Sequence, residues 1–220
     1  NWDAELQLVS VADGTVQTIL NGGQNAHIAA ARWIEQGATL LLATDCGREM
    51  HGIAALDIAS GGLTWLAEPE GDVELLAVSK DESLLAYAVN VEGYTRIMVQ
   101  ERASGAARGI EGLPAGRATS LIFAEGGAAL LLAITRFDKP SAIWRVDLAT
   151  GEAREILAGT PTLAEGDTVA PRIVAIDSFD GAKVPAFVFE PRDPKPGRPA
   201  LVIVHGGPEG QYAAHWRSDV

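Results

Sequence analysis

The sequence is poor in cysteine, in basic residues and in long apolar runs. Cys46 is the single cysteine among 220 residues, so no disulfide can form within the chain, and a disulfide-stapled scaffold is excluded. The 17 Lys and Arg residues are outnumbered by 29 Asp and Glu residues, and the resulting net charge of −12 argues against binding to nucleic acid. Because no run of about 18 apolar residues occurs, we expect no membrane span.

Motifs for cofactors and metals are missing as well. The sequence has neither a Walker-type loop nor Gly-x-Gly-x-x-Gly, and His27, His51 and His215 lack the spacing of a zinc site, so we expect no cofactor and no metal. The N-terminus has no initiator Met and no basic-then-apolar signal pattern. We therefore expect the chain to be a fragment of a longer protein. The compartment stays open, with the cytoplasm favoured and the periplasm as the alternative.

A short phrase ending in glycine recurs four times along the chain. The copies begin at Ser10, Asp57, Glu101 and Asp147, with spacings of 47, 44 and 46 residues, and each ends in Gly four positions later. Alternating apolar residues precede each copy, and another short strand-like run follows it. A small polar residue followed by Gly between two such runs predicts a β-hairpin turn.

A second phrase repeats with a similar period. Stretches beginning at Trp33, Val78 and Phe123, offset by 45 residues each time, lead into the apolar runs 40–44, 85–89 and 130–134. Four short strands in each unit of about 45 residues predict a blade of a β-propeller. The chain would hold about three blades plus a hairpin of an earlier one. Aromatic side chains are expected to pack between the blades; these are Trp33, Trp65, Tyr87, Phe123 and Trp144.

The pattern changes after residue 157. We expect a partial propeller over 1–160, a turn-rich linker over 161–171, and the first strands of an α/β-hydrolase domain over 172–220. In this last part, Asp180-Gly181 predicts a hairpin turn, and a proline-rich connection leads into the apolar run Ala200–Val204. That run predicts a buried parallel strand. The expected fold class is mainly β.

The predicted strand ends in His205-Gly206-Gly207-Pro208. Glycines lack a Cβ, so the backbone can approach a reacting carbonyl closely. In α/β-hydrolases the loop after such a strand gives a backbone N–H to the oxyanion hole. These four residues are therefore the candidate oxyanion loop.

The propeller repeat followed by this loop resembles the prolyl oligopeptidase family of serine peptidases, and within it the acylaminoacyl-peptidase and dipeptidyl-aminopeptidase-like branch. The resemblance covers essentially the whole chain. It implies a Ser-Asp-His triad, short peptides as substrates, a propeller that restricts their access, and a homo-oligomer as one option. Backbone donation would come from Gly206 or Gly207, whereas His205 either donates or only shapes the turn. Glu209 and Gln211 would contact a substrate amine or be solvated.

One expected motif is missing. The Gly-x-Ser-x-Gly nucleophile elbow should follow the oxyanion strand, and it occurs nowhere in the 220 residues. The triad is therefore expected beyond residue 220, and these residues alone are expected to be inactive. The alternative is a β-propeller that binds a partner without catalysis. A carboxylesterase with the same loop is disfavoured, because esterases do not usually have a propeller.

Overall fold

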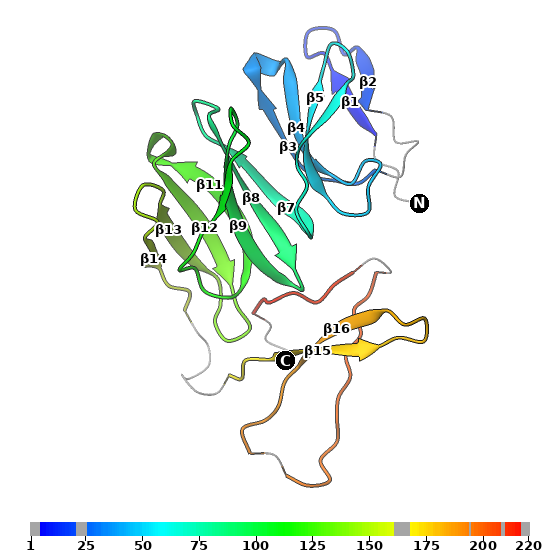
Figure 1. Cartoon of the computed structure of the whole chain (residues 1–220), viewed down its shortest axis with the longest axis vertical. Helices are drawn as coiled ribbons and strands as arrows, with labels where there is room; N and C mark the ends of the chain where they lie inside the picture. The colour runs from blue at the N-terminus through cyan, green and yellow to red at the C-terminus, as the bar shows by residue number, and fades with distance from the viewer. Residues whose placement is uncertain (1–4, 21–25, 161–167, 194, 208–209, 217–220) are drawn as a thin grey trace.

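The computed structural model describes residues 5–20, 26–160, 168–193, 195–207 and 210–216, and almost all of their regular structure is β (Figure 1). Three four-stranded sheets have the orders β3-β4-β5-β6, β7-β8-β9-β10 and β11-β12-β13-β14, and all their pairings are antiparallel. A two-stranded hairpin precedes them and another follows. The prediction of three propeller blades plus an earlier hairpin is confirmed.

The strands follow one another without crossovers within each sheet. The first hairpin is β1 (Leu6–Val9) and β2 (Val16–Leu20). The first blade is β3 (Ile28–Ile34), β4 (Thr39–Thr44), β5 (Gly52–Asp57) and β6 (Leu63–Ala67). The second blade is β7 (Asp72–Val78), β8 (Leu84–Val91), β9 (Tyr94–Glu101) and β10 (Ala107–Gly109). The third blade is β11 (Arg117–Ala124), β12 (Ala129–Thr135), β13 (Ala142–Asp147) and β14 (Ala153–Leu157). The last hairpin is β15 (Arg172–Asp177) and β16 (Lys183–Val188).

The glycine-ended phrase forms the same hairpin turn each time. Gly14, Gly61, Gly105 and Gly151 have φ values of 75°, 71°, 72° and 76°, which only glycine adopts without strain. In each copy the glycine N–H donates to the carbonyl of the first residue of the phrase. A side chain adds to this in the second copy, where the Asp57 carboxylate accepts hydrogen bonds from the Ser60 N–H and hydroxyl at 2.7 and 2.6 Å.

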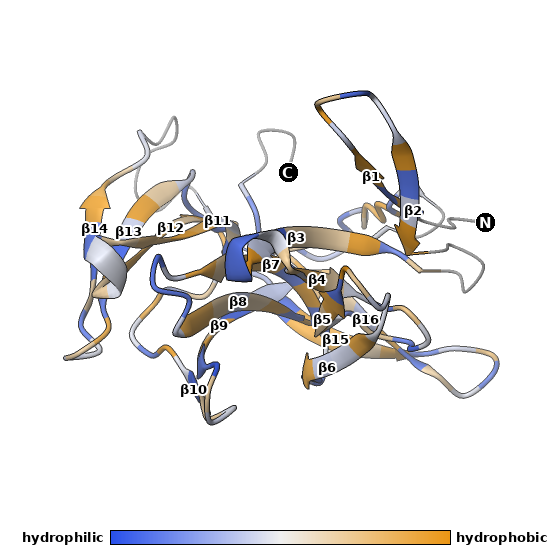
Figure 2. Ribbon diagram, turned by 90° about the horizontal axis from the view of Figure 1, so that it is seen from above, coloured by the Kyte–Doolittle hydropathy of each residue, from blue (hydrophilic) through white to orange (hydrophobic). Residues whose placement is uncertain are grey.

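The second strands of the first two blades, β4 and β8, are apolar on both faces because each face packs against a neighbouring unit. On β4, Leu41 and Ala43 enter the core shared with the second blade, while Leu40 and Leu42 face the β1–β2 hairpin. On β8, Leu85 and Tyr87 face the first blade, and the alternate residues Ala86 and Ala88 face the third. Successive side chains of a strand point to opposite faces, so one strand contributes to two cores. In Figure 2 much of the ribbon of the blade strands is coloured as hydrophobic.

The expectation that aromatic residues pack between blades holds for part of the set. Tyr87 is 3% exposed, and Phe123 and Trp144 pack against the core between the second and third blades. For Trp33 the prediction is wrong, because this residue is 50% exposed. It neighbours Ile34, which belongs to the core with the second blade, so Trp33 points to the opposite face. Among the described residues, the apolar cluster on that face is shared with the two-stranded β1–β2 hairpin.

The last part of the chain differs from the prediction. The Asp180-Gly181 turn joins β15 to β16 as expected, with Gly181 at φ 87°. The run Ala200–Val204 forms no strand and is not buried: Leu201 is 85% exposed and Val202 is 81% exposed. In the described residues no strand pairs with it, and no α-helix exists to cover it, so it lacks both partners that a parallel strand needs.

Two further expectations concern the linker and the absence of a membrane span. Residues 161–167, which form most of the expected linker, lie outside the described residues. In the part of the chain that the structure describes, no helix is long and apolar enough to cross a membrane.

Candidate functional site: the oxyanion loop and the blade rim beneath it

The candidate oxyanion loop is exposed where its sequence is described. His205, Gly206 and Gly207 are exposed, and Pro208 and Glu209 lie outside the described residues. The ring Nδ1 of His205 lies 3.1 Å from the Gly206 carbonyl oxygen, so Nδ1–H donates to it. No atom lies within 4 Å of the position that a Cβ would take at Gly206. The space beside this backbone is open, as an approaching carbonyl would require.

The residues after the loop fold back onto it. A Cβ at Gly210 would collide with the Gly206 carbonyl oxygen and would lie 2.9 Å from Nδ1 of His205, so glycine is required there. The rings of His205 and Tyr212 meet edge to face, with centroids 6.2 Å apart. This arrangement joins the exposed loop to the segment 211–216.

That segment is seated on one rim of the blades, below the lower ends of the sheets in Figure 1. The Ala214 N–H donates to the Gly93 carbonyl at 2.7 Å, at the turn between β8 and β9. Asn90, at the end of β8, donates to the side chain of Gln211 at 2.7 Å. Trp216 N–H donates to the hydroxyl of Thr135, at the end of β12, at 3.0 Å. The Gln211 side chain is thus held by a contact with the second blade.

An aromatic cluster lies beside this seat. Phe137, in the loop between β12 and β13, has its ring centroid 4.8 Å from that of Phe187 and 5.2 Å from that of Phe189. Tyr94 meets Phe137 and Phe187 at 6.3 and 5.7 Å. All four contacts are edge to face, a preferred geometry for aromatic pairs. Burial, and then the nearby Asp138 carboxylate, raise the pKa of Tyr94, so its hydroxyl stays protonated at neutral pH.

Two histidines that are distant in sequence come together between the first and second blades. His51 Nδ1 lies 2.9 Å from the Asp72 carboxylate, and His51 Nε2 lies 2.8 Å from His27 Nδ1. Since a carboxylate only accepts, His51 donates from Nδ1 and His27 donates to His51 when both rings are neutral. Within the described residues no group of three metal-binding side chains occurs. The pair therefore acts as a hydrogen-bonded link between two blades.

Arginine side chains in two loops of the blades form ion pairs. Arg48 lies 2.6 Å from Glu68 and over the ring of Trp65, with 4.8 Å to its centroid. Arg136 lies 2.6 Å from Asp138. Burial, and then the Asp45 charge, raise the pKa of the Cys46 thiol, which keeps it in the less reactive protonated form at neutral pH.

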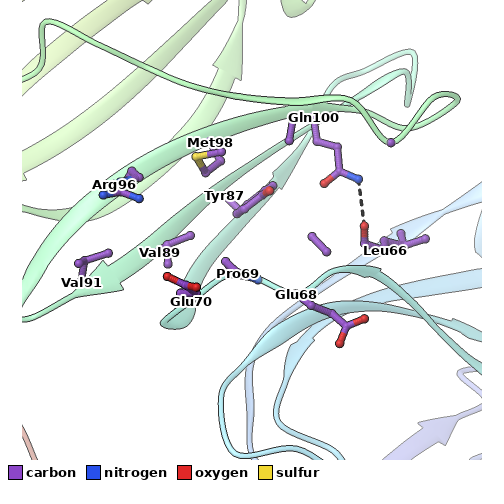
Figure 3. A pocket seen from close by; sticks show the side chains of 13 residues that line it. Leu66, Glu68, Pro69, Glu70, Tyr87, Val89, Val91, Arg96, Met98 and Gln100 are labelled. Atoms are coloured by element: carbon purple, nitrogen blue, oxygen red, sulfur yellow. Dashed lines mark hydrogen bonds between the residues drawn. The ribbon is translucent and has the colours of Figure 1, made fainter.

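A crevice opens between the first and second blades, with a volume of about 480 Å³ (Figure 3). Gln100 is 4% exposed and donates to the Leu66 carbonyl at 3.1 Å, and its Oε1 has no hydrogen-bond partner among the described residues. Tyr87 and Met98 form an apolar floor, whereas Glu70 and Arg96 bring charges of opposite sign. This mixture does not select one class of ligand.

No family model matches the sequence. Solved structures do match. Over 98% of this chain, a crystal structure of puromycin hydrolase has a TM-score of 0.79 and 22% identity, with 35% of that chain covered. A puromycin-hydrolyzing peptidase from Mycobacterium tuberculosis matches 96% of this chain at a TM-score of 0.74 and 23% identity, with 34% of that chain covered.

A prolyl endopeptidase matches over 99% of this chain, at a TM-score of 0.79 and 17% identity, with 32% of that chain covered. The neighbours are peptidases of the prolyl oligopeptidase type. The chain has the fold of part of such a peptidase. It spans about a third of the length of the peptidases that it matches. At these identities the likeness establishes the fold, which here includes the propeller blades.

Sequence reasoning singles out the candidate oxyanion loop but misses the contacts that hold the segment after it against the blades. Gly93 and Asn90 were not singled out, although the dipeptide Glu92-Gly93 between two apolar runs is itself a hairpin signal. Phe137 stands among charged residues in the sequence, and no local pattern predicts its aromatic contacts. Nothing in the sequence pairs residue 93 with residue 214, because contacts between distant segments leave no local pattern.

Proposed function

We propose that this chain is part of a serine peptidase of the prolyl oligopeptidase type that hydrolyses short peptides. The supporting observation is the extent of the match: the peptidase structures cover 96–99% of a chain that holds both the blades and the segment containing His205-Gly206-Gly207. In this proposal residues 1–160 belong to the propeller, 161–171 to a linker, and 172–220 to the start of an α/β-hydrolase domain.

The proposed chemistry is acyl transfer through a serine ester. Backbone N–H groups of Gly206 or Gly207 would stabilise the oxyanion of the tetrahedral intermediate, and a Ser-Asp-His triad would lie after residue 220. The propeller would limit access to short peptides. The neighbours include a puromycin hydrolase complexed with PGG and a prolyl endopeptidase, which supports a peptide-like substrate with an amide bond.

The first test uses the protein extended beyond Val220 and a fluorophosphonate probe, which labels activated serines. We expect labelling of one serine within a Gly-x-Ser-x-Gly sequence, and none in the 220-residue chain. Chromogenic substrates with an acetylated or a free N-terminus would then separate acylaminoacyl-peptidase from dipeptidyl-peptidase activity. An extended protein without labelling would favour the non-catalytic propeller.

A point variant tests the oxyanion assignment. Gly206→Ala is tolerated sterically, because nothing lies within 4 Å of the added Cβ and the backbone φ is not positive. The methyl group would occupy the space of the reacting carbonyl, so kcat should fall about 10²–10³-fold, the range for a lost oxyanion donor. Val11→Ala, at a fully exposed position in the turn between β1 and β2, is the control and should leave kcat unchanged. Equal activity in both variants would contradict the assignment.

A further inference from the structure

The turn between β8 and β9 fits the segment 211–214 so closely that its glycine cannot be replaced without disturbance. Gly93 has φ 84°, which other residues adopt only with strain. A Cβ at Gly93 would lie 2.8 Å from the Tyr212 carbonyl oxygen and 2.9 Å from Cζ of Phe187. Its own carbonyl accepts the Ala214 N–H at 2.7 Å. The turn therefore touches both the segment after the oxyanion loop and the hairpin β15–β16.

Asn90 holds this turn and the segment together through all the polar atoms of its side chain. Oδ1 accepts the Gly93 N–H at 2.9 Å, and Nδ2 donates to Gln211 at 2.7 Å and to Glu74 at 3.0 Å. Glu74, on β7, also lies 3.4 Å from Arg117 on β11. This network thus links β7 and β11, the first strands of the second and third blades, to Gln211, which lies five positions after Gly206.

The segment after the loop is packed against the blades, whereas the loop and the run before it are exposed. Ala213 is 3% exposed and Ala214 is 0% exposed, although 201–207 are all exposed. Between them, Gly210 packs against Gly206 and the Tyr212 ring meets His205. Among the described residues the run 200–204 has no strand partner. In the part of the chain that the structure describes, the contacts that tie the loop to the blades are therefore those made through 211–214.

We infer that Gly93 and Asn90 are positioning residues for the oxyanion loop, so that the second blade sets where the Gly206 and Gly207 N–H groups point. The inference rests on the proposed peptidase function. It gives the propeller a role in the chemical step in addition to limiting access. A displacement of about 1 Å at a donor is enough to lower a rate about 10²-fold.

The test compares Gly93→Ala with Gly47→Ala in the extended protein. Gly47 is a matched control: it lies in the β4–β5 loop of the first blade, its φ is 72°, and nothing lies within 4 Å of its Cβ position. Both variants strain a turn, but only Gly93→Ala pushes on the seated segment. We expect kcat on a short chromogenic substrate to fall about ten- to a hundredfold for Gly93→Ala with KM within about twofold, and neither to change for Gly47→Ala.

Asn90 is tested by a double-mutant cycle with Gln211. If the two side chains act through one contact, the fall in kcat for Asn90→Ala combined with Gln211→Ala should be about the same as for Asn90→Ala alone. Fully multiplicative effects would mean that Asn90 acts elsewhere. That result, or an unchanged kcat in Gly93→Ala, would overturn the inference.

A readout that is independent of activity separates the two proposals. Amide hydrogen exchange of the peptide 211–216 should become faster in Gly93→Ala and stay as in the parent in Gly47→Ala. Faster exchange with unchanged kcat would leave the peptidase proposal standing and overturn the positioning role. Absence of serine labelling in the parent protein would overturn both, whatever the exchange shows.

Discussion

The blades and the C-terminal region are built by different rules. In the first two blades, the second strand has apolar residues on both faces and buries both, as Leu41 and Leu42 on β4 show at 0% exposed. In the C-terminal region an equally apolar run, Ala200–Val204, is left in solvent. The difference teaches that apolar composition specifies a buried strand only when the partners for both of its faces and edges are part of the same folding unit.

The two regions also differ in how far apart their contacting residues lie along the chain. Each blade pairs neighbouring strands through short turns, so its register is set locally by residues such as Gly61 and Asp57. The segment 211–216 is held by Asn90, Gly93 and Thr135, which are remote in sequence. Local pairing is inexpensive in chain entropy, whereas remote contacts form only after the loops that separate them close.

The largest expected effect comes from removing core volume in a blade. Leu130→Ala deletes a side chain that is 0% exposed in the core between the second and third blades, so unfolding free energy should fall by about 2–5 kcal/mol. Val202→Ala is the counterpart in the exposed run and should change it by less than about 0.5 kcal/mol. Urea unfolding followed by circular dichroism measures both. A similar loss of unfolding free energy in both variants would contradict the difference between the blades and the C-terminal region.

A smaller effect is expected at the repeated turn. Gly151→Ala forces an L-residue to φ 76° with no steric contact at the added methyl, so the cost is backbone strain of about 1–2 kcal/mol. Gly206→Ala, in the C-terminal region, adds a methyl where φ is not positive and should leave stability unchanged. Thermal unfolding of the two variants beside the parent distinguishes them. A stable Gly151→Ala variant would mean that the turns do not fix the blade register.

An ion cluster between the first and second blades should contribute less. Arg102 lies 2.6 Å from Glu35 and 3.6 Å from Glu82, and the Glu35 N–H donates to the Glu82 carboxylate. All three side chains are partly exposed, so Arg102→Met should cost about 0.2–1 kcal/mol. The difference from the parent should shrink in about 1 M salt, where charges are screened. A cost independent of salt would indicate lost packing instead.

The smallest effect is a pH dependence that arises in the turns. Hydrogen bonds from Ser60 lower the pKa of Asp57 below its ordinary value of 3.8, and hydrogen bonds from Thr150 do the same for Asp147. Because the folded-state pKa is lowered, the stabilisation is present above pH 3.8 and is lost as the pH falls through the folded values. Asp57→Asn should therefore flatten the acid limb of a plot of unfolding midpoint against pH. An unchanged limb would show that Asp57 contributes nothing to it.

The blade architecture could be predicted because it repeats. The glycine-ended phrase and the apolar runs fix strand number, order and turn positions, and the structure confirms them. The candidate oxyanion loop follows from its residue types and stays a prediction, whereas the residues that surround it could not be predicted. Trp33 was misplaced because alternation shows that a side chain lies on one face and not how fully the next unit covers that face.

The sequence by itself determined the strands, the four hairpin turns and the position of His205-Gly206-Gly207 after an apolar run, since each depends on residues adjacent in the chain. Only the tertiary structure decided that Ala200–Val204 stays exposed and that Gly93 and Asn90 hold the segment after the loop. The physical reason is that burial and steric fit depend on which remote groups arrive beside a residue, and no local pattern encodes them.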